Sequence, residues 1–199
     1  MFSYSWDLAE NGVAKTVNEL AKIGINSVTL ASSYHAGKFL RPKSATNKVY
    51  FPEDGTVYFK SDPAKYGAIK PIPNSIHGEG QVLRELTETK GLSVSAWLVL
   101  LHNTPLGTKH QDSAVRNAFG DPYIYALCPS APEARAYAIG LAKDVTESYE
   151  VDGISVESIG FPPYEHGYHH EMSFVRPNKW LSQNLGLCFC KFSMPFFAG

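Results

Sequence analysis

The amino-acid sequence predicts an α/β fold in which parallel β-α repeats form the amino-terminal half of a TIM-type barrel. Short apolar runs alternate with segments of helical periodicity, as expected for parallel strands joined by right-handed crossovers. The stretch 92–101 is almost continuously apolar, which is typical of a strand buried on both faces of a parallel sheet. The 199 residues contain four strand signals, whereas a complete barrel takes roughly 250 residues. We therefore expect one partial domain spanning 1–199, either an open sheet or a barrel truncated halfway.

The first repeat is predicted from residue 2 onward. A strand is expected at 2–6 and a helix at 11–23, where apolar residues recur at helical spacing. Gly24 is a helix stop signal, and the sequence INSVTLA predicts a second strand at 25–31.

Two stretches lack this regular pattern. The segment 33–74 is rich in Tyr, Pro, Lys and Gly, and we expect a small hairpin in it around Asp54-Gly55. Long connections in compact domains are usually functional or disordered, and the aromatic content of this segment favours function. Residues 160–199 show no further β-α unit and are expected to form an irregular tail.

The second half of the pattern is the most informative part of the chain. A helix is expected at 76–90 before the apolar run. The next helix is expected to begin with Ser130 as its N-cap and Glu133 as its capping-box partner. Asp152-Gly153 then opens a fourth strand of alternating apolar residues, and Glu157 lies near the end of that strand.

The composition bounds the classes of partner. A formal net charge of −1 gives no long-range attraction for nucleic acid or anionic lipid, and no apolar run approaches the length of a membrane span. Met1 leads directly into FSYSWDL, so we expect no signal peptide and, by default, a cytoplasmic location. Seven His and 13% aromatic residues suit a site for flat or sugar-like ligands, and they suit ordinary packing equally well.

The cysteines predict neither a disulfide framework nor a cofactor. Three cysteines are few and odd in number. Cys188 and Cys190 form a CxC pair, which is a weak metal signal without further ligands nearby. Cys128 precedes a proline at a helix entrance and is expected to be an inert buried thiol. We therefore expect no metal and no cofactor.

The candidate site lies where the strands end. In parallel α/β folds, ligands bind at the carboxyl ends of the strands, and polar side chains cluster after the predicted strands here. Glu157 is predicted to be a general acid or base in a dry pocket. The residues expected to bind substrate beside it are Trp6, Tyr34, His35, His102, Asn103, Tyr164, His166 and His169.

Each of these residues also has a structural interpretation. Glu157 could be satisfied by a neighbouring Arg or by a backbone amide, Trp6 could belong to the core, and Asn103 could close its strand with hydrogen bonds. Asp7 is expected to cap the first helix. The HGYHHE run from His166 to Glu171 is an alternative metal site, although its spacing does not match the HExxH pattern.

The motif CPSAPEARAY, followed by DGISVE and preceded by AWLVLLHN and NAFGD, resembles the glycoside-hydrolase-like (β/α)8 barrels of bacterial origin. In those proteins a C-P-x-x-P-x-x-R-x-Y helix leads into a D-G-I-x-[LF]-[DE] strand. The resemblance runs from Phe2 to Cys190 and is densest between Trp97 and Glu171. It implies a carbohydrate substrate and an acidic residue at the end of strand four, here Glu157.

The resemblance also implies a second carboxylate on a later strand, commonly the seventh, which this chain does not reach. The resulting prediction is a glycoside hydrolase that is inactive alone if the chain is truncated. The alternatives are a carbohydrate-binding protein without hydrolysis and a metal-dependent hydrolase that uses the cluster His166–Glu171. An open half-barrel would also leave its first and fourth strands as bare edges, which favours self-association.

Overall fold

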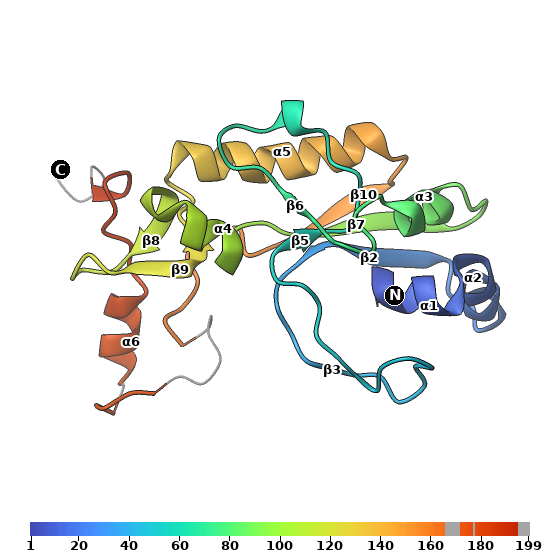
Figure 1. Ribbon diagram of the computed structural model, residues 1–199, viewed down its shortest axis with the longest axis horizontal. Coiled ribbons are helices and arrows are strands. Elements are labelled where there is room, and N and C mark those ends of the chain that lie inside the picture. The colour runs from blue at the N-terminus through green and yellow to red at the C-terminus, as the bar shows by residue number, and fades with distance from the viewer. Residues whose placement is uncertain (166–171, 177, 195–199) are drawn as a thin grey trace.

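The computed structural model describes residues 1–165, 172–176 and 178–194. Its centre is a six-stranded, mostly parallel sheet (Figure 1), in which four parallel strands lie side by side in chain order. The four parallel strands are β1 (Phe2–Tyr4), β2 (Ser27–Tyr34), β7 (Ser93–Val99) and β10 (Gly153–Glu157). The predicted mixed α/β architecture with a mostly parallel sheet is confirmed.

Helices connect consecutive strands of this sheet and bury one of its faces. Alternate residues of β2 and β7, such as Leu30 and Ala96, are fully buried. They belong to the same core cluster as Leu83 and Leu141 from the helices, because period-2 strand faces and period-3.6 helix faces turn toward each other. The connecting helices are α2 (Val13–Lys22), α3 (Gln81–Thr87) and α5 (Pro132–Ser148).

The opposite face of the sheet has a different character. The register places Tyr4, Ala31, Trp97 and Ser155 in one row across the four strands. In a neighbouring row, Phe2 is 64% exposed. This face therefore presents aromatic rings and small side chains, of which several are accessible to solvent.

The amino-terminal prediction needs a correction. The strand ends at Tyr4, and Ser5–Asn11 form the helix α1, so Trp6 lies on a helix and not on a strand. Gly12 has a φ of 83°, a backbone conformation that glycine adopts at no steric cost, and it separates α1 from α2. The sequence pattern did not indicate that Ser5–Asn11 form a helix of their own before α2.

The long loop folds differently from the prediction. No hairpin forms around Asp54-Gly55. Instead β5 (Thr56–Val57) pairs antiparallel with the end of β2, and β6 (Ile72–Pro73) pairs with β5. The hairpin of this loop lies earlier, between β3 (Phe39–Leu40) and β4 (Val49–Tyr50), and the short 3-10 helix η1 covers Pro63–Lys65.

Two predicted helix starts are also wrong. The helix expected at 76–90 begins only at Gln81, because the side chain of Asn74 accepts hydrogen bonds from the amides of Ile76 and His77 and forms a turn there. For α5 the N-cap is Ala131 rather than Ser130. Glu133 does not complete a capping box: its Oε2 accepts a hydrogen bond of 2.8 Å from the amide of Ala68 in the long loop.

A hairpin that the sequence pattern did not predict extends the molecule beside the sheet (Figure 1). It joins the main sheet through an isolated bridge between His102 and Ala126 and a hydrogen bond from the Leu127 amide to the Leu101 carbonyl. The hairpin consists of β8 (Ala114–Arg116) and β9 (Pro122–Leu127), and α4 (Thr104–Lys109) and η2 (Gln111–Ser113) precede it. The segment 160–199, expected to be an irregular tail, contains the helix α6 (Lys179–Leu185). In the described parts of the chain, no helix combines the length and hydropathy that crossing a membrane requires.

Candidate functional site

Glu157 is the last residue of β10 and is half-buried at the carboxyl end of the sheet. Its Oε2 accepts a hydrogen bond of 2.9 Å from Nε1 of Trp97, on the neighbouring strand β7. The carboxylate is therefore held by an indole, a partner that differs from the Arg or backbone amide of the structural interpretation. Trp97 was not among the predicted site residues, because it lies inside a run that reads as uniformly apolar.

Aromatic rings surround the indole of Trp97. The centroid of Phe2 lies 5.4 Å from that of Trp97, and the centroid of Tyr34 lies 5.2 Å away; both pairs meet edge to face. Tyr4 lies 5.8 Å from Trp97 and stacks on Trp6 with a separation of 4.6 Å. Edge-to-face and offset pairs of this kind stabilise a rigid wall. The carboxylate of Glu157 thus emerges from an aromatic surface.

Tyr34 is a protonated donor within this surface. Burial raises the pKa of its phenol, and the hydrogen-bonded Tyr4 hydroxyl, 3.4 Å away, and the negative charge of Glu157 raise it further. A register shift between Ala31 and Ser33 of β2 marks an irregularity just before this residue, and such bulges re-aim the side chains that follow. At neutral pH the Tyr34 hydroxyl keeps its proton.

A row of stacked rings leads from Tyr34 toward the hairpin. Tyr34 stacks on His35 at 4.5 Å, and His35 stacks on His102 at 4.7 Å. The rings of His102 and Tyr125 are 6.0 Å apart. The structure therefore brings Tyr34, His35 and His102 together, as expected of residues that follow neighbouring parallel strands.

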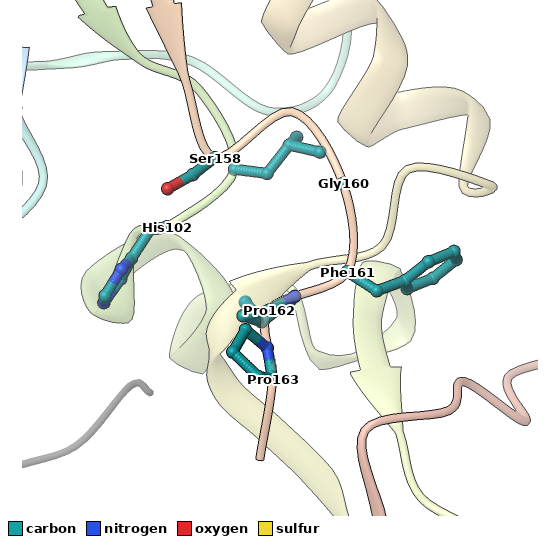
Figure 2. Close-up of a pocket in the computed structure, with 8 residues that line it drawn as sticks. His102, Ser158, Gly160, Phe161, Pro162 and Pro163 are labelled. Carbon is teal, nitrogen blue, oxygen red and sulfur yellow. The ribbon is translucent and has the colours of Figure 1, made fainter. Parts of the chain in front are cut away.

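Beyond Glu157 the chain forms one wall of a pocket of about 190 Å³. Ser158 has a φ of 55°, unusual for a residue other than glycine, and such backbone outliers concentrate at functional sites. Figure 2 shows His102 and Ser158 on one side of this pocket, with the loop through Phe161 and Pro163 on the other. The lining residues are Leu101, His102, Ala126, Ser158, Gly160, Phe161, Pro162 and Pro163.

The structure gives Trp6 and Asn103 structural roles in place of the predicted binding roles. Trp6 is 3% exposed and packs against Tyr58 in the interior. Asn103 is 4% exposed: its Oδ1 accepts from the Leu106 amide and so caps α4, and its Nδ2 donates to the Gly55 carbonyl. Neither side chain lies on the accessible surface around Glu157.

Tyr164 lies farther along the row of rings. It packs against Tyr123 at 6.2 Å, and Tyr123 stacks on Tyr125, so Tyr164 is positioned beside the hairpin. His166 and His169, and with them the alternative metal cluster His166–Glu171, lie outside the described residues.

Other carboxylates considered in the sequence have partners of their own. Asp7 does not cap a helix as expected: it lies in the first turn of α1 and forms an ion pair of 2.6 Å with Arg41. Asp152, at the opposite end of β10 from Glu157, accepts a hydrogen bond of 2.7 Å from the Val94 amide. Among the described residues, no cluster of three metal-ligating side chains includes Glu157.

Two solved structures are similar to the chain. A crystal structure of a hypothetical protein from Ruminiclostridium thermocellum ATCC 27405 aligns with a TM-score of 0.52 and 17% identity, over 81% of this chain and 77% of that one. A noncanonic maltogenic alpha-amylase from Thermotoga neapolitana aligns with a TM-score of 0.48 and 20% identity, over 79% of this chain and 36% of that one. No protein-family model and no curated protein matches the sequence. The first likeness shows a shared fold.

Proposed function

We propose that the chain is a carbohydrate-active protein of the glycoside-hydrolase type, in which the four parallel strands form half of a (β/α)8 barrel and Glu157 is the general acid or base. The observation that carries this proposal is the position of Glu157: it ends the fourth parallel strand, and the Trp97 indole orients its carboxylate within an aromatic surface. Ligands bind at this end of the strands in parallel α/β folds.

The surroundings of Glu157 suit a sugar. Aromatic faces such as Trp97 offer a flat apolar surface to a pyranose ring, and the protonated Tyr34 hydroxyl is a hydrogen-bond donor beside it. His35 and His102 add ring nitrogens along the edge of the site. In the proposed reaction Glu157 protonates the glycosidic oxygen or takes a proton from the attacking water.

A second candidate is carbohydrate binding without hydrolysis. Hydrolysis by the usual mechanism needs two carboxyl groups on either side of the scissile bond. Arg41 pairs with Asp7, and the Val94 amide donates a hydrogen bond to Asp152. These contacts favour neither carboxylate as the second catalytic carboxyl group beside Glu157. In this second candidate function the same aromatic surface binds the sugar, and Glu157 accepts a hydrogen bond from a hydroxyl group.

The Glu157→Gln variant separates the two candidates. The amide keeps the shape and the hydrogen bond from Trp97 but cannot transfer a proton, so we expect kcat/KM toward aryl glycosides and oligosaccharides to fall by about 10²- to 10⁴-fold while the oligosaccharide Kd measured by calorimetry changes little. Glu150→Gln is the matched control, because Glu150 is exposed just before the opposite end of the same strand.

Each outcome has one meaning. Turnover that is lost in Glu157→Gln and retained in Glu150→Gln supports catalysis by Glu157. Binding without turnover in the unmodified chain supports the second candidate, provided that Trp97→Ala abolishes the binding. Turnover that survives in Glu157→Gln, or an absence of both binding and turnover across a set of soluble glycans, would overturn the proposal.

A further inference from the structure

Three cysteines that are distant in the sequence meet in the interior of the protein. Cys128 follows β9, whereas Cys188 and Cys190 follow α6. The Sγ of Cys128 lies 3.7 Å from that of Cys188 and 3.5 Å from that of Cys190, and all three sulfur atoms lie within 4.8 Å of one another. The thiols are free and buried. The CxC pair of Cys188 and Cys190 has no further ligand nearby in the sequence, and the fold supplies Cys128.

A fourth polar atom completes the cluster. The Oγ of Ser193 lies 3.5 Å from the Sγ of Cys128 and 3.5 Å from the Sγ of Cys190, and Ser193 is itself 3% exposed. The chain turns back at this point, because the Ser193 amide donates to the Cys190 carbonyl. A buried hydroxyl among three thiols is unusual in a purely apolar core.

The spacing of these four atoms fits tetrahedral coordination. Zinc binds thiolates at about 2.3 Å and oxygen at about 2.0 Å, so a regular tetrahedron places two sulfurs about 3.8 Å apart and a sulfur and an oxygen about 3.5 Å apart. Four of the six edges agree with these values: the two sulfur pairs of Cys128, at 3.5 and 3.7 Å, and the two sulfur–oxygen pairs of Ser193, at 3.5 Å. The sulfurs of Cys188 and Cys190 lie within 4.8 Å of each other. A disulfide would require about 2.05 Å and would leave one thiol unpaired.

The surroundings also suit negative charge on the sulfur atoms. The amide of Arg116 points at the Sγ of Cys188 at 3.5 Å. Cys128 lies just before the amino terminus of the 17-residue helix α5, whose N-cap amide, at Ala131, donates to the Cys128 carbonyl. Backbone donors and a helix amino terminus both stabilise thiolates, as outer-shell groups do around metal sites.

We propose that Cys128, Cys188, Cys190 and Ser193 form a structural zinc site, with three thiolates and the Ser193 oxygen as ligands. On binding, Zn²⁺ displaces the three thiol protons to solvent and leaves a complex with one net negative charge. The Arg116 amide and the amino terminus of α5 both face this charge. The site closes the segment 188–193 onto the hairpin of β8 and β9. It shares no residue with the surface around Glu157 and does not depend on the proposed function.

Metal titration of the reduced full chain tests the site. We expect one Zn²⁺ or Co²⁺ per chain after dialysis, sulfur-to-cobalt charge-transfer bands with the d–d bands of a tetrahedral complex, and protection of all three thiols from alkylation. Because the metal binds the folded chain, Tm should rise with zinc and fall with a chelator. Absence of bound metal, or a native mass that shows a disulfide and one free thiol, would overturn the proposal.

Variants test each ligand separately. Loss of an outer-shell partner weakens metal binding by about 10- to 100-fold, and replacement of any one cysteine by Ser should weaken zinc binding by more than that. Ser193→Ala should weaken binding, and Ser193→Cys should strengthen it and give the cobalt spectrum of four thiolates. Unchanged affinity in Ser193→Ala would remove Ser193 from the ligand set. Cobalt spectra of the unmodified chain test the thiolate ligands even if a cysteine variant fails to fold.

Discussion

Single side chains fasten the irregular parts of this chain to its helices, and Glu10 is the clearest case. It lies on α1 and accepts hydrogen bonds from the Ser44 hydroxyl and from the amides of Ala45 and Thr46, while Arg41 pairs with it from the same loop. These hydrogen bonds, led by that of Ser44, lower the pKa of Glu10 from 4.5 to about 2. One carboxylate thus connects the β3–β4 loop to α1.

This shift predicts how stability depends on pH. Because the pKa of Glu10 is lower in the folded than in the unfolded state, its contribution is complete above pH 4.5 and is lost as the pH falls toward 2. We expect the free energy of unfolding, measured by urea titration, to fall more steeply with acid in the unmodified chain than in Glu10→Gln. Glu19→Gln, at an exposed position of α2, should keep the steep dependence; equal slopes in all three proteins would contradict the assignment.

The site residues show which features a sequence can reveal at this scale. Tyr34, His35 and His102 follow predicted strands, so their proximity could be predicted from strand direction alone. The burial of Trp6 and Asn103 could not, because residue type does not determine whether a side chain faces a core or a cleft. The hydrogen bond from Trp97 to Glu157 was hidden for the same reason.

Among the elements, α5 anchors the long loop through a buried carboxylate. Asp144 is fully buried, accepts hydrogen bonds of 2.8 Å from the Asp62 amide and from the Tyr66 hydroxyl, and pairs with Lys65 at 3.2 Å. Gly140, one turn earlier, lets the loop approach the helix closely, since a Cβ there would meet the Tyr66 ring at 2.6 Å. The order of the loop thus depends on α5.

Removal of this carboxylate should be costly. Asp144→Ala leaves the Asp62 amide and the Tyr66 hydroxyl without their acceptor and removes the buried one of the two carboxylates that pair with Lys65. We expect the free energy of unfolding to fall by about 3–5 kcal/mol. Glu147→Gln is the control: Glu147 also pairs with Lys65, but it is exposed, so its loss should cost about 1 kcal/mol or less. Chemical denaturation at neutral pH measures both, and similar losses would argue against the anchoring role.

Local periodicity was sufficient to predict the four parallel strands and the helices α2, α3 and α5. The β8–β9 hairpin was missed because its attachment depends on backbone bonds to Leu101 and Asn103, which no local pattern encodes. A signal was present in its turn, where the Asn117 side chain accepts from the Phe119 and Asp121 amides. The thiol cluster joins residues about 60 positions apart, and no local sequence pattern indicates that they meet.

At the scale of the whole molecule, β10 is the last strand of the sheet formed by the described residues. Its backbone pairs with β7 on one side, and its apolar side chains are partly exposed: Ile154 by 41% and Val156 by 45%, followed by Ile159 at 63%. An apolar edge strand of this kind is a template for pairing with another chain. The self-association predicted from the sequence pattern would therefore involve this edge.

We predict a concentration-dependent association that a charge on this edge abolishes. Sedimentation velocity should show a larger species growing with concentration, and Val156→Lys should return the protein to a monomer, because a lysine at an exposed edge opposes strand addition. Leu40→Lys is the control, since Leu40 is 74% exposed on β3, which belongs to a different sheet. A monomer at every concentration, or dissociation by the control, would contradict the prediction.

The contact between Trp97 and Glu157 has a spectroscopic consequence. The chain has three tryptophans: Trp6 is buried, Trp180 is 71% exposed, and Trp97 is half-buried with its N–H on a carboxylate. Their emission should therefore separate, with a blue-shifted component from Trp6 and a component from Trp180 that a dissolved quencher suppresses. The remaining fluorescence comes from the indole that touches Glu157, so a ligand that binds at the proposed site should change this component, and no attached label is needed to measure it.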